Sequence, residues 1–277
     1  MSDRAREPDL FDVSGRVVVI TGGYGQLGAE YAAAFAGRGA RVAIFDLLEE
    51  PAASGADLAP GLRDGSIRAW RVDVTDRSSI ERALAEVVQA WDVPHVLVNN
   101  AAIDAPPDAP PEEVGPFEDV PVESLEQVMR VNVTGTVLCC QVVGGAMAEA
   151  GRGSVVNVSS IYGLLSPVQE LYAFRRATGE KFVKPVAYSL SKSAVLNLTR
   201  YLATYWAGHG VRVNTLTLAG VWNDQPDEFV RAYTARVPLG RMLEPREAVG
   251  AVVFLASDAS SYVTGANVVV DGGWTAW

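Results

Sequence analysis

A tyrosine and a lysine four residues apart are the first pair in this sequence that could do chemistry. Tyr188 and Lys192 stand at the start of a strong helical pattern, so their spacing places both side chains on one helix face. An ammonium beside a phenol favours the phenolate and lowers the phenol pKa from about 10. Such a phenol suits general acid/base catalysis. Taken alone, the pair fits a solvated helix face better, so its meaning depends on the residues that accompany it.

A glycine-rich turn near the N-terminus offers a phosphate site. The apolar run Val17 to Ile20 leads into "TGGYGQLG", and a helical pattern follows. Gly23, Gly25 and Gly28 satisfy G-x-G-x-x-G in the strand-to-helix setting that gives this weak motif meaning. Glycines permit a tight turn and a close approach of the backbone to a pyrophosphate, whose charge the helix N-terminus favours. An ordinary glycine-rich turn is the alternative.

Asp46 favours a dinucleotide at this turn. It ends the second apolar run, 18 residues after Gly28, near the roughly 20-residue spacing at which an acid meets the adenosine ribose hydroxyls. A carboxylate there repels a 2′-phosphate, and the following "LLEE" contains no arginine to receive one. The sequence therefore predicts NAD(H) rather than NADP(H). A carboxylate that only caps the strand is the alternative.

The elements that position these residues alternate between strands and helices. Fully apolar strands separated by helices indicate a parallel sheet covered on both faces. The expected fold class is therefore α/β, a single-domain doubly wound parallel sheet (Rossmann fold) of about seven strands. The expected strands are Val17–Thr21, Arg41–Asp46, Ile67–Arg71, Val96–Asn99, Ser154–Ser159, Val211–Thr217 and Asn267–Val270. The expected helices lie near Gln26–Gly37, Ser79–Trp91, Val122–Ala150, Ala187–His209 and Arg246–Ser257.

Composition argues against several kinds of partner. The 277 residues carry a formal net charge of −10, which opposes binding to nucleic-acid phosphates. The apolar stretches fall short of the roughly 20 residues that cross a bilayer, and residues 1–8 lack the apolar core of a signal peptide. Adjacent Cys139 and Cys140 diverge in a helix and do not suit a disulfide, and His95 and His209 have no metal-ligand spacing. We expect a cytoplasmic protein without nucleic-acid, membrane or metal partners.

Eight segments spread along the chain resemble the short-chain dehydrogenase/reductase family. The resemblance covers about residues 15–277 and implies hydride exchange between a nicotinamide and an alcohol or carbonyl carbon. It implies an arm at residues 1–14, an NAD-binding Rossmann domain at 15–277, and a homo-oligomer, commonly a tetramer, built on the two longest helices. The segments are "TGGYGQLG" at Thr21, "VDV" at Val72, "VNNAA" at Val98, "VNVTG" at Val131, "NVSSIYG" at Asn157, "YSLSK" at Tyr188, "VRVNTL" at Val211 and "TGANVVVDGG" at Thr264.

The resemblance also implies a role for each matching position. Tyr188 would exchange the proton of the substrate hydroxyl, and Ser160 would hydrogen-bond the substrate oxygen. Lys192 would hold the nicotinamide ribose and depress the tyrosine pKa, and Asn132 would anchor a water chain leading to Lys192. The residues expected to bind NAD are Gly22, Gly25, Gln26, Leu27, Gly28, Asp46, Asp73, Val74, Asn100, Ala101, Ala102, Tyr188, Lys192 and Val221.

Two departures from the family pattern lie in the cofactor loops. Gln26 stands where the compact branch has glycine, and the glycine spacing here matches the branch that modifies nucleotide sugars. An epimerase or dehydratase with retained NAD is therefore an alternative function, and a non-catalytic NAD(H)-binding sensor is another. Leu218 and Ala219 replace Pro-Gly in the loop that meets the nicotinamide carboxamide, where backbone near Val221 is still expected to serve. Residues 222–240 should form a short helix and lid.

The third departure is an insertion, residues 163–187, between Ser160 and the tyrosine. Its four basic residues either form a solvated loop or receive an anionic or hydroxyl-rich substrate such as a polyol, aldonate or sugar derivative. Tyr172 precedes Arg176 by four residues and is a rival for the catalytic tyrosine, because arginine stays protonated and could depress a phenol pKa. Tyr188 is preferred because only it leads into the long helix. The basic residues are Arg175, Arg176, Lys181 and Lys184.

Overall fold

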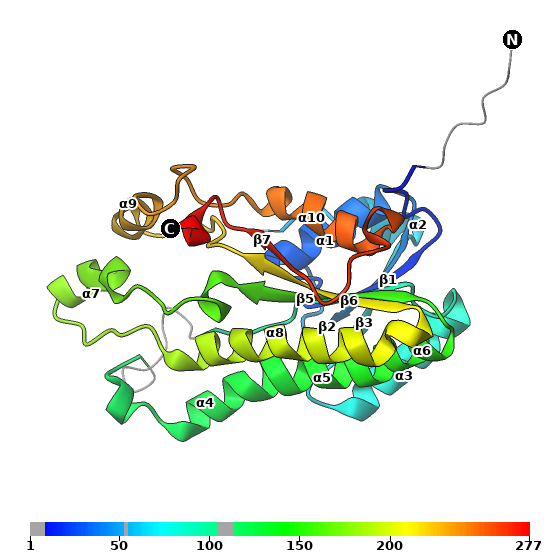
Figure 1. Ribbon diagram of the computed structural model, residues 1–277, viewed down its shortest axis with the longest axis horizontal. Coiled ribbons are helices and arrows are strands. Elements are labelled where there is room, and N and C mark those ends of the chain that lie inside the picture. The colour runs from blue at the N-terminus through cyan, green and yellow to red at the C-terminus, as the bar shows by residue number, and fades with distance from the viewer. Residues whose placement is uncertain (1–8, 53–54, 105–113) are drawn as a thin grey trace, which may run out of the picture.

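A seven-stranded parallel sheet forms the centre of the molecule. The computed structural model describes residues 9–52, 55–104 and 114–277. The strands follow the order β3-β2-β1-β4-β5-β6-β7, with helices on both faces (Figure 1), which confirms the predicted fold class. Five strands have the predicted bounds, whereas β5 and β6 are longer than predicted. The strands are β1 (Val17–Thr21), β2 (Arg41–Asp46), β3 (Ile67–Arg71), β4 (Val96–Asn99), β5 (Gly153–Ser160), β6 (Val211–Leu218) and β7 (Asn267–Val270).

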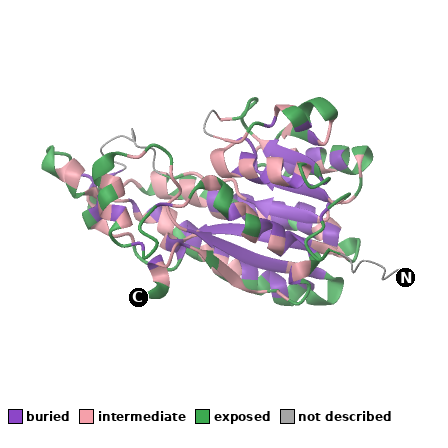
Figure 2. Cartoon of the chain, turned by 90° about the horizontal axis from the view of Figure 1, so that it is seen from above, coloured by how far each residue is buried: buried purple, intermediate pink, exposed green. Residues whose placement is uncertain are grey.

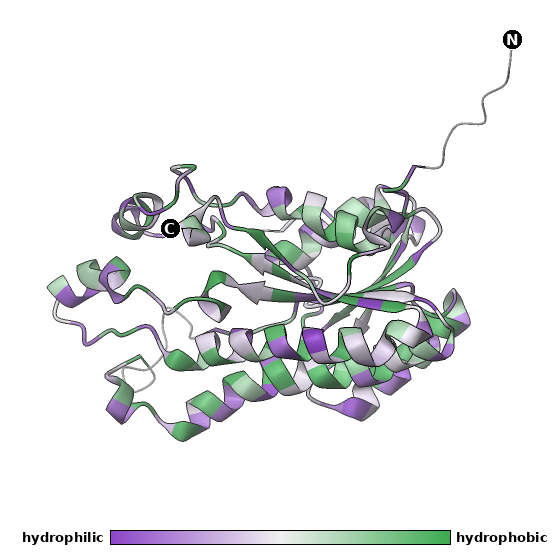
Figure 3. Ribbon diagram, viewed as in Figure 1, coloured by the Kyte–Doolittle hydropathy of each residue, from purple (hydrophilic) through white to green (hydrophobic). Residues whose placement is uncertain are grey.

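The central strands read as unbroken apolar runs because they contribute to two cores. Successive side chains of a strand point to opposite faces of the sheet. In β1, Val18 and Ile20 belong to the cluster on one face, and Val17 and Val19 belong to the cluster on the other. Figure 2 shows the buried sheet between partly exposed helices, and Figure 3 shows the same strands as the hydrophobic centre.

Helices from distant parts of the chain cover each face. Above the sheet in Figure 1 lie α1 (Gln26–Ala36) and α10 (Val249–Ala256), which contact each other. Below it lie α3 (Arg77–Ala90), α8 (Val186–Trp206) and the helical run after β4. The sequence predicted these helices to within three residues at each end, once the 3-10 turns Ala207–His209 and Pro245–Ala248 are counted with α8 and α10. A short helix that it did not predict is α2 (Ala59–Asp64).

The helical run after β4 is continuous but changes its winding. It consists of α4 (Val122–Met129), the π-helical η2 (Arg130–Gly135), α5 (Thr136–Cys139), the π-helical η3 (Cys140–Gly144) and α6 (Gly145–Glu149). Within the part of the chain that the structure describes, this run is long and apolar enough to cross a membrane by length and composition only, although the expectation from the sequence was that the apolar stretches are too short. Half of its most apolar window is buried inside the molecule, and the run contacts α3 and α8, as a core helix does.

The sheet order brings the predicted site residues to one edge. Between β1 and β4 the order of the strands reverses, and ligands of such sheets bind at the carboxyl ends of the strands near this point. The glycine turn follows β1, Asn100 follows β4, and Ser160 ends β5. All three therefore lie at the carboxyl edge, beside the first turn of α8.

The insertion and the lid form one layer beyond the carboxyl edge. The insertion contains η5 (Gln169–Tyr172) and α7 (Ala173–Ala177), and the lid contains α9 (Asp227–Thr234). Both lie at the left of Figure 1, near the C-terminus. The Tyr172 and Phe229 rings, one from each segment, have centroids 5.6 Å apart. A third buried cluster anchors this layer and consists of Ile161, Leu171, Tyr233, Val237, Met242 and Trp274.

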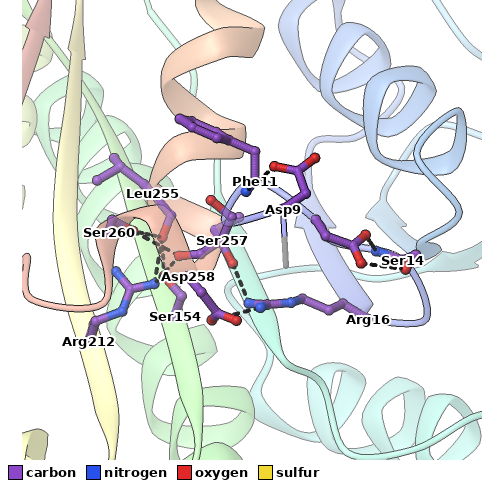
Figure 4. Close-up of polar contacts among 12 residues, drawn as sticks. Asp9, Phe11, Ser14, Arg16, Ser154, Arg212, Leu255, Ser257, Asp258 and Ser260 are labelled. Atoms are coloured by element: carbon purple, nitrogen blue, oxygen red, sulfur yellow. Dashed lines mark hydrogen bonds and ion pairs between the residues drawn. The ribbon is translucent and has the colours of Figure 1, made fainter. Parts of the chain in front are cut away.

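Arginines close the opposite edge of the sheet by binding backbone carbonyls (Figure 4). Arg16 donates to the Ala256 carbonyl at 2.8 Å and pairs with Asp258 at 2.7 Å. The Phe11 ring lies 6.4 Å from the Phe254 ring. The described part of the predicted N-terminal arm, residues 9–14, is therefore packed on the domain, and residues 1–8 lie outside the described residues. Arg212 donates to the carbonyls of Leu255, Ser257 and Val263.

Candidate active site

Tyr188, Ser160 and Lys192 meet in the wall of a cavity of about 980 Å³ at the carboxyl edge. Tyr188 comes from the first turn of α8, and Lys192 follows one turn later. Ser160 ends β5, and its Oγ accepts a hydrogen bond from the Tyr162 N–H at 3.2 Å. The Lys192 Nζ atom lies 5.6 Å from the Tyr188 ring centroid. The structure thus brings together the three side chains that the sequence selected.

The acidity of Tyr188 differs from the expectation based on spacing alone. Burial raises the pKa of Tyr188, the charge of Asp104 raises it further, and the hydrogen bond from Ser160 lowers it. Lys192 is itself buried, and its Nζ donates to the Val158 carbonyl at 3.0 Å. Burial lowers the pKa of Lys192 to about 8. The structure does not show the predicted lowering of the Tyr188 pKa, because burial disfavours the charged forms of both Tyr188 and Lys192.

Asn132, a residue of the π-helical segment η2, hydrogen-bonds both the loop that follows β4 and the helix α8. Its Oδ1 accepts from the Ile103 N–H at 2.8 Å, and its Nδ2 donates to the Ile103 carbonyl and to Ser191 Oγ, both at 2.9 Å. Asn132 is buried and lies outside the cavity wall. It therefore holds the backbone before Asp104 against the residue next to Lys192, and the water chain stays a prediction.

The glycine turn forms a cradle that fits a pyrophosphate. A Cβ on Gly28 would lie 2.1 Å from the Gly22 carbonyl oxygen, and Gly22 has φ +64° with the Ala101 Cα close by. A Cβ on Gly25 would meet only that same oxygen, at 3.4 Å. Because Gly25 is the N-cap residue of α1 and carries no side chain, room remains over the N–H groups that start the helix. Packing inside the chain explains Gly22 and Gly28, whereas the room at Gly25 fits a pyrophosphate.

Asp46 holds this turn from the end of β2. Its carboxylate accepts from the Tyr24 N–H at 2.9 Å and from the Leu48 N–H at 3.0 Å. Each carboxylate oxygen has a further lone pair for a ribose hydroxyl. Its negative charge stands where a 2′-phosphate would add more, so the geometry fits the predicted preference for NAD(H).

The remaining predicted cofactor residues lie along the same edge with different contacts. Asn100 donates through Nδ2 to the carbonyls of Thr21 and Gly22 at 3.2 and 3.0 Å, so it stabilises the glycine turn. The Asp73 carboxylate accepts from the Thr75 N–H and hydroxyl, both at 2.8 Å. Of the predicted set, the cavity wall includes Leu27, Asn100, Ala102, Tyr188, Lys192 and Val221; Gly22, Gly25, Gln26, Gly28, Asp46, Asp73, Val74 and Ala101 lie outside it.

Gln26, which replaces a family glycine, reaches the lid. Its Nε2 donates to the Trp222 carbonyl at 2.7 Å. The Trp222 N–H in turn donates to the Leu243 carbonyl, and Leu243 pairs with Val221 in an isolated bridge. The side chain therefore links the glycine turn to the first residue of the lid, a role that the sequence did not reveal.

Tyr172 lies in the cavity wall, but the cation predicted beside it points elsewhere. Arg176 donates to the Gln169 carbonyl at 2.9 Å and pairs with Glu170 at 3.3 Å. Tyr172 packs on Phe182, and burial raises the pKa of Tyr172. The pairing of Tyr172 with Arg176 was therefore wrong as a catalytic unit.

The insertion places two of its four basic residues in the cavity wall. Arg175 pairs with Glu180 at 2.6 Å and lies over the Phe182 ring, and Lys184 pairs with Asp104. Both carboxylates also line the cavity. Asp104 is a site residue that the sequence reasoning missed, although an acid directly after "VNNAAI" was a visible signal. Within residues 9–52, 55–104 and 114–277, no group of three or more metal-ligand side chains is found.

Comparison with known proteins identifies the class of this site. A family model described as enoyl-(acyl carrier protein) reductase matches residues 25–275. D-threitol dehydrogenase of Mycolicibacterium smegmatis is 33% identical over 273 residues, which cover 96% of this chain and 95% of the relative. The chain belongs to the short-chain dehydrogenase/reductase family, as its motifs predicted. It is an oxidoreductase of that family.

Solved structures agree on the fold and differ in cofactor. A short-chain dehydrogenase from Leptospira borgpetersenii with bound NAD+ has a TM-score of 0.84 at 31% identity, covering 99% of both chains. A gluconate 5-dehydrogenase from Burkholderia cenocepacia in complex with NADP and tartrate has a TM-score of 0.81 at 27% identity, covering 97% of this chain and 98% of the other. The comparisons therefore establish an oxidoreductase with a Rossmann fold. They do not distinguish NAD from NADP, so the residues of the site must indicate which cofactor binds.

Proposed function

We propose that this chain is an NAD(H)-dependent oxidoreductase that interconverts a secondary alcohol and a ketone. The observation that carries the proposal is the meeting of Ser160, Tyr188 and Lys192 in the wall of one cavity, which Leu27 of the glycine turn also lines. A hydroxyl pair at this place can hold one substrate oxygen and move one proton. The adjacent glycine cradle supplies the site for the dinucleotide.

Each catalytic side chain has a separate task in this proposal. In the oxidation direction Tyr188, as the phenolate, takes the proton of the substrate hydroxyl, and in reduction it returns that proton. Ser160 donates a hydrogen bond that stabilises negative charge on the Tyr188 oxygen or on the substrate oxygen. Lys192 is anchored by the Val158 carbonyl and has two more N–H donors for a ribose hydroxyl. The nicotinamide, when bound, accepts or supplies the hydride.

The choice of NAD(H) over NADP(H) rests on Asp46. Its carboxylate is held by two backbone N–H groups at the end of β2, which keeps the charge in place. The next four residues are leucines and glutamates, so the local charge disfavours a phosphate on the ribose. The NAD+ bound to the similar Leptospira borgpetersenii chain supports the proposal.

The proposed substrate is hydroxyl-rich, such as a polyol or a sugar derivative. The cavity wall combines hydroxyls and charged groups with the aromatic rings of Phe174, Phe182 and Phe229. D-threitol dehydrogenase, a similar protein over nearly its whole length, is named for a polyol. An aldonate stays in the proposed set because the similar gluconate 5-dehydrogenase is named for one.

The proposed enzyme is a cytoplasmic homotetramer built on α8 and the run Val122–Glu149. Tyr201 and Tyr205 of α8 are 62% and 63% exposed, and their rings stack at 5.9 Å. Two large exposed rings on one helix face suit contact with another copy. Val133 and Val137 of the apolar run are only partly buried, which supports the same proposal.

A nucleotide-sugar epimerase or dehydratase is the second candidate function. It is favoured by one observation, the spacing of Gly22, Gly25 and Gly28, and it would keep its NAD bound through the reaction. The same residues could also serve a sensor that binds NAD(H) without turnover. A dehydrogenase exchanges its cofactor with solution during turnover, whereas the epimerase or dehydratase retains it and the sensor has no turnover. Free exchange of cofactor during turnover would therefore favour the dehydrogenase.

The test is NAD-linked turnover on a panel of D-threitol, gluconate, sugars and apolar secondary alcohols. Tyr188→Phe should lower kcat by about 10²–10⁴-fold on every substrate that the native chain oxidises, while NADH binding persists. Tyr172→Phe is the control, because its ring lines the same cavity, and it should retain catalysis. Activity that survives Tyr188→Phe, or faster turnover with NADPH than with NADH, would contradict the proposal.

A further inference from the structure

Asp104 lines the same cavity wall as Tyr188, although it belongs to a different loop. Its charge raises the pKa of Tyr188 and acts on Tyr162, Tyr172 and Lys192 as well. A single carboxylate influences all four groups because they share one cavity wall, which Asp104 also lines. Asp104 therefore has a position from which it can touch a substrate held by Tyr188.

Lys184 is held in place beside the same ring. The Gln169 side chain binds its backbone twice, donating to the Lys184 carbonyl at 3.2 Å and accepting from the Lys184 N–H at 2.8 Å. The Lys184 side chain is only 10% exposed, and it forms an ion pair with Asp104. Its Nζ lies 5.6 Å from the Tyr188 ring centroid, the same distance as the Lys192 Nζ. The insertion thus delivers one fixed, paired cation to the catalytic tyrosine.

The described cavity wall carries equal numbers of acidic and basic side chains. Three carboxylates and three cations line it, and the insertion cations Arg175 and Lys184 each have a carboxylate partner in the wall. An anionic substrate would have to compete with Glu180 or Asp104 for its cation and would face the other carboxylate. A neutral substrate meets no such cost. The charged residues of the wall are Asp104, Glu180, Asp224, Arg175, Lys184 and Lys192.

We propose that the Asp104–Lys184 pair binds a second substrate hydroxyl, on the carbon next to the one oxidised, so that the enzyme selects neutral vicinal diols and polyols. A hydroxyl both donates and accepts, and the pair offers one acceptor and one donor beside Tyr188. Hydrogen bonds to charged groups are the stronger kind. The aromatic rings opposite pack on the carbon chain. This inference rests on the proposed function, because it assumes that Tyr188 holds the reacting hydroxyl.

The experiment compares matched alcohols with NAD+ as the oxidant. Cyclohexanol and cyclohexane-1,2-diol form one pair, and butan-2-ol and butane-2,3-diol form the other. The native chain should have a kcat/KM about 10–100-fold higher for each diol, the range expected for one hydrogen bond to a charged group. Asp104→Asn should remove most of this preference, and Lys184→Met, a change in the other segment, should do the same. Asp104→Asn should also raise the kcat/KM for 3-hydroxybutanoate relative to that for butan-2-ol, because the change leaves Lys184 available to pair with a substrate carboxylate.

The control is Glu170→Gln, a carboxylate-to-amide change in the same insertion. Glu170 pairs with Arg176 and lies outside the cavity wall, so the ratio of diol to mono-alcohol kcat/KM should stay unchanged. If Asp104→Asn lowered kcat/KM equally for a diol and its matched mono-alcohol, Asp104 would be a general structural residue. That result would overturn the inference. A native chain that oxidises mono-alcohols as well as diols would also overturn it, while leaving the proposed function intact. A chain that oxidises no alcohol with NAD+ would refute both.

Discussion

At the scale of single residues, the catalytic tyrosine depends on competing influences. Burial and Asp104 raise the pKa of Tyr188, and the hydrogen bond from Ser160 lowers it. Burial lowers the pKa of Lys192 to about 8, so this side chain is mostly protonated at pH 7 and loses its charge as the pH rises above 8. Ser160 is the neighbour that most directly stabilises the phenolate in this structure. Its removal should affect both the rate and its pH dependence.

Ser160→Ala should lower kcat for alcohol oxidation by about 10²–10³-fold, the effect of losing one donor to a charged reaction oxygen. The same change removes a cause that lowers the Tyr188 pKa, so that pKa rises. Because oxidation needs the phenolate, the acidic limb of the pH profile should move to higher pH. The profile of kcat/KM against pH measures the shift. A limb that stays in place would show that Ser160 does not bond Tyr188 in the working enzyme.

At the scale of elements, each junction joins a buried strand to a helix under tight steric limits. The turn between β1 and α1 needs Gly28 because the Gly22 carbonyl occupies the space of a Cβ. Gln26, in the first turn of α1, ties this turn to the lid through the Trp222 carbonyl. The insertion and α9 meet through the Tyr172 and Phe229 rings. Cofactor loop, insertion and lid are therefore mechanically connected around one cavity.

Alanine substitutions at Gly28 and Gly25 should separate folding from cofactor binding. Gly28→Ala places a Cβ 2.1 Å from a carbonyl oxygen and should cost about 3 kcal/mol in the free energy of unfolding. Gly25→Ala meets only an ordinary contact at 3.4 Å, so stability should change by less than about 1 kcal/mol. Its methyl group would instead stand over the start of α1 and weaken NADH binding. Urea unfolding and NADH fluorescence titration measure the two effects.

The comparison between these two variants is decisive. Equal losses of stability would mean that both glycines serve the fold, and the cofactor would not explain Gly25. Unchanged NADH affinity in Gly25→Ala would place the pyrophosphate elsewhere.

At the scale of the whole molecule, the described residues form one domain in which the two edges of the sheet differ. The carboxyl edge carries the cavity, and the amino edge is closed by Arg16 and Arg212 on backbone carbonyls (Figure 4). The outer face of α8 carries the exposed Tyr201 and Tyr205. A surface of this kind supports the proposed assembly of copies.

The proposed tetramer should sediment with four times the 29.5 kDa mass of the chain. Tyr201→Glu combined with Tyr205→Glu adds two charges to the proposed contact and should yield smaller species in sedimentation velocity. Tyr262→Glu is a matched control, because Tyr262 is fully exposed in the turn before β7 and outside the proposed contact, so it should leave the assembly unchanged. A native chain that sediments as a monomer would refute the tetramer.

The sequence alone determined the strands to within one residue at each end, the family, and the three side chains that meet in the cavity wall. Strands buried on both faces must be apolar throughout, and the motifs at Thr21, Asn157 and Tyr188 occur in a fixed order, so local patterns carried this information. Only the tertiary structure decided the surroundings of these residues. Asp104 and Lys184 are 80 residues apart and pair across the cavity, and Gln26 meets Trp222 across 196 residues. The direction of the Tyr188 pKa shift likewise follows from burial, because desolvation depends on neighbours that chain folding brings together.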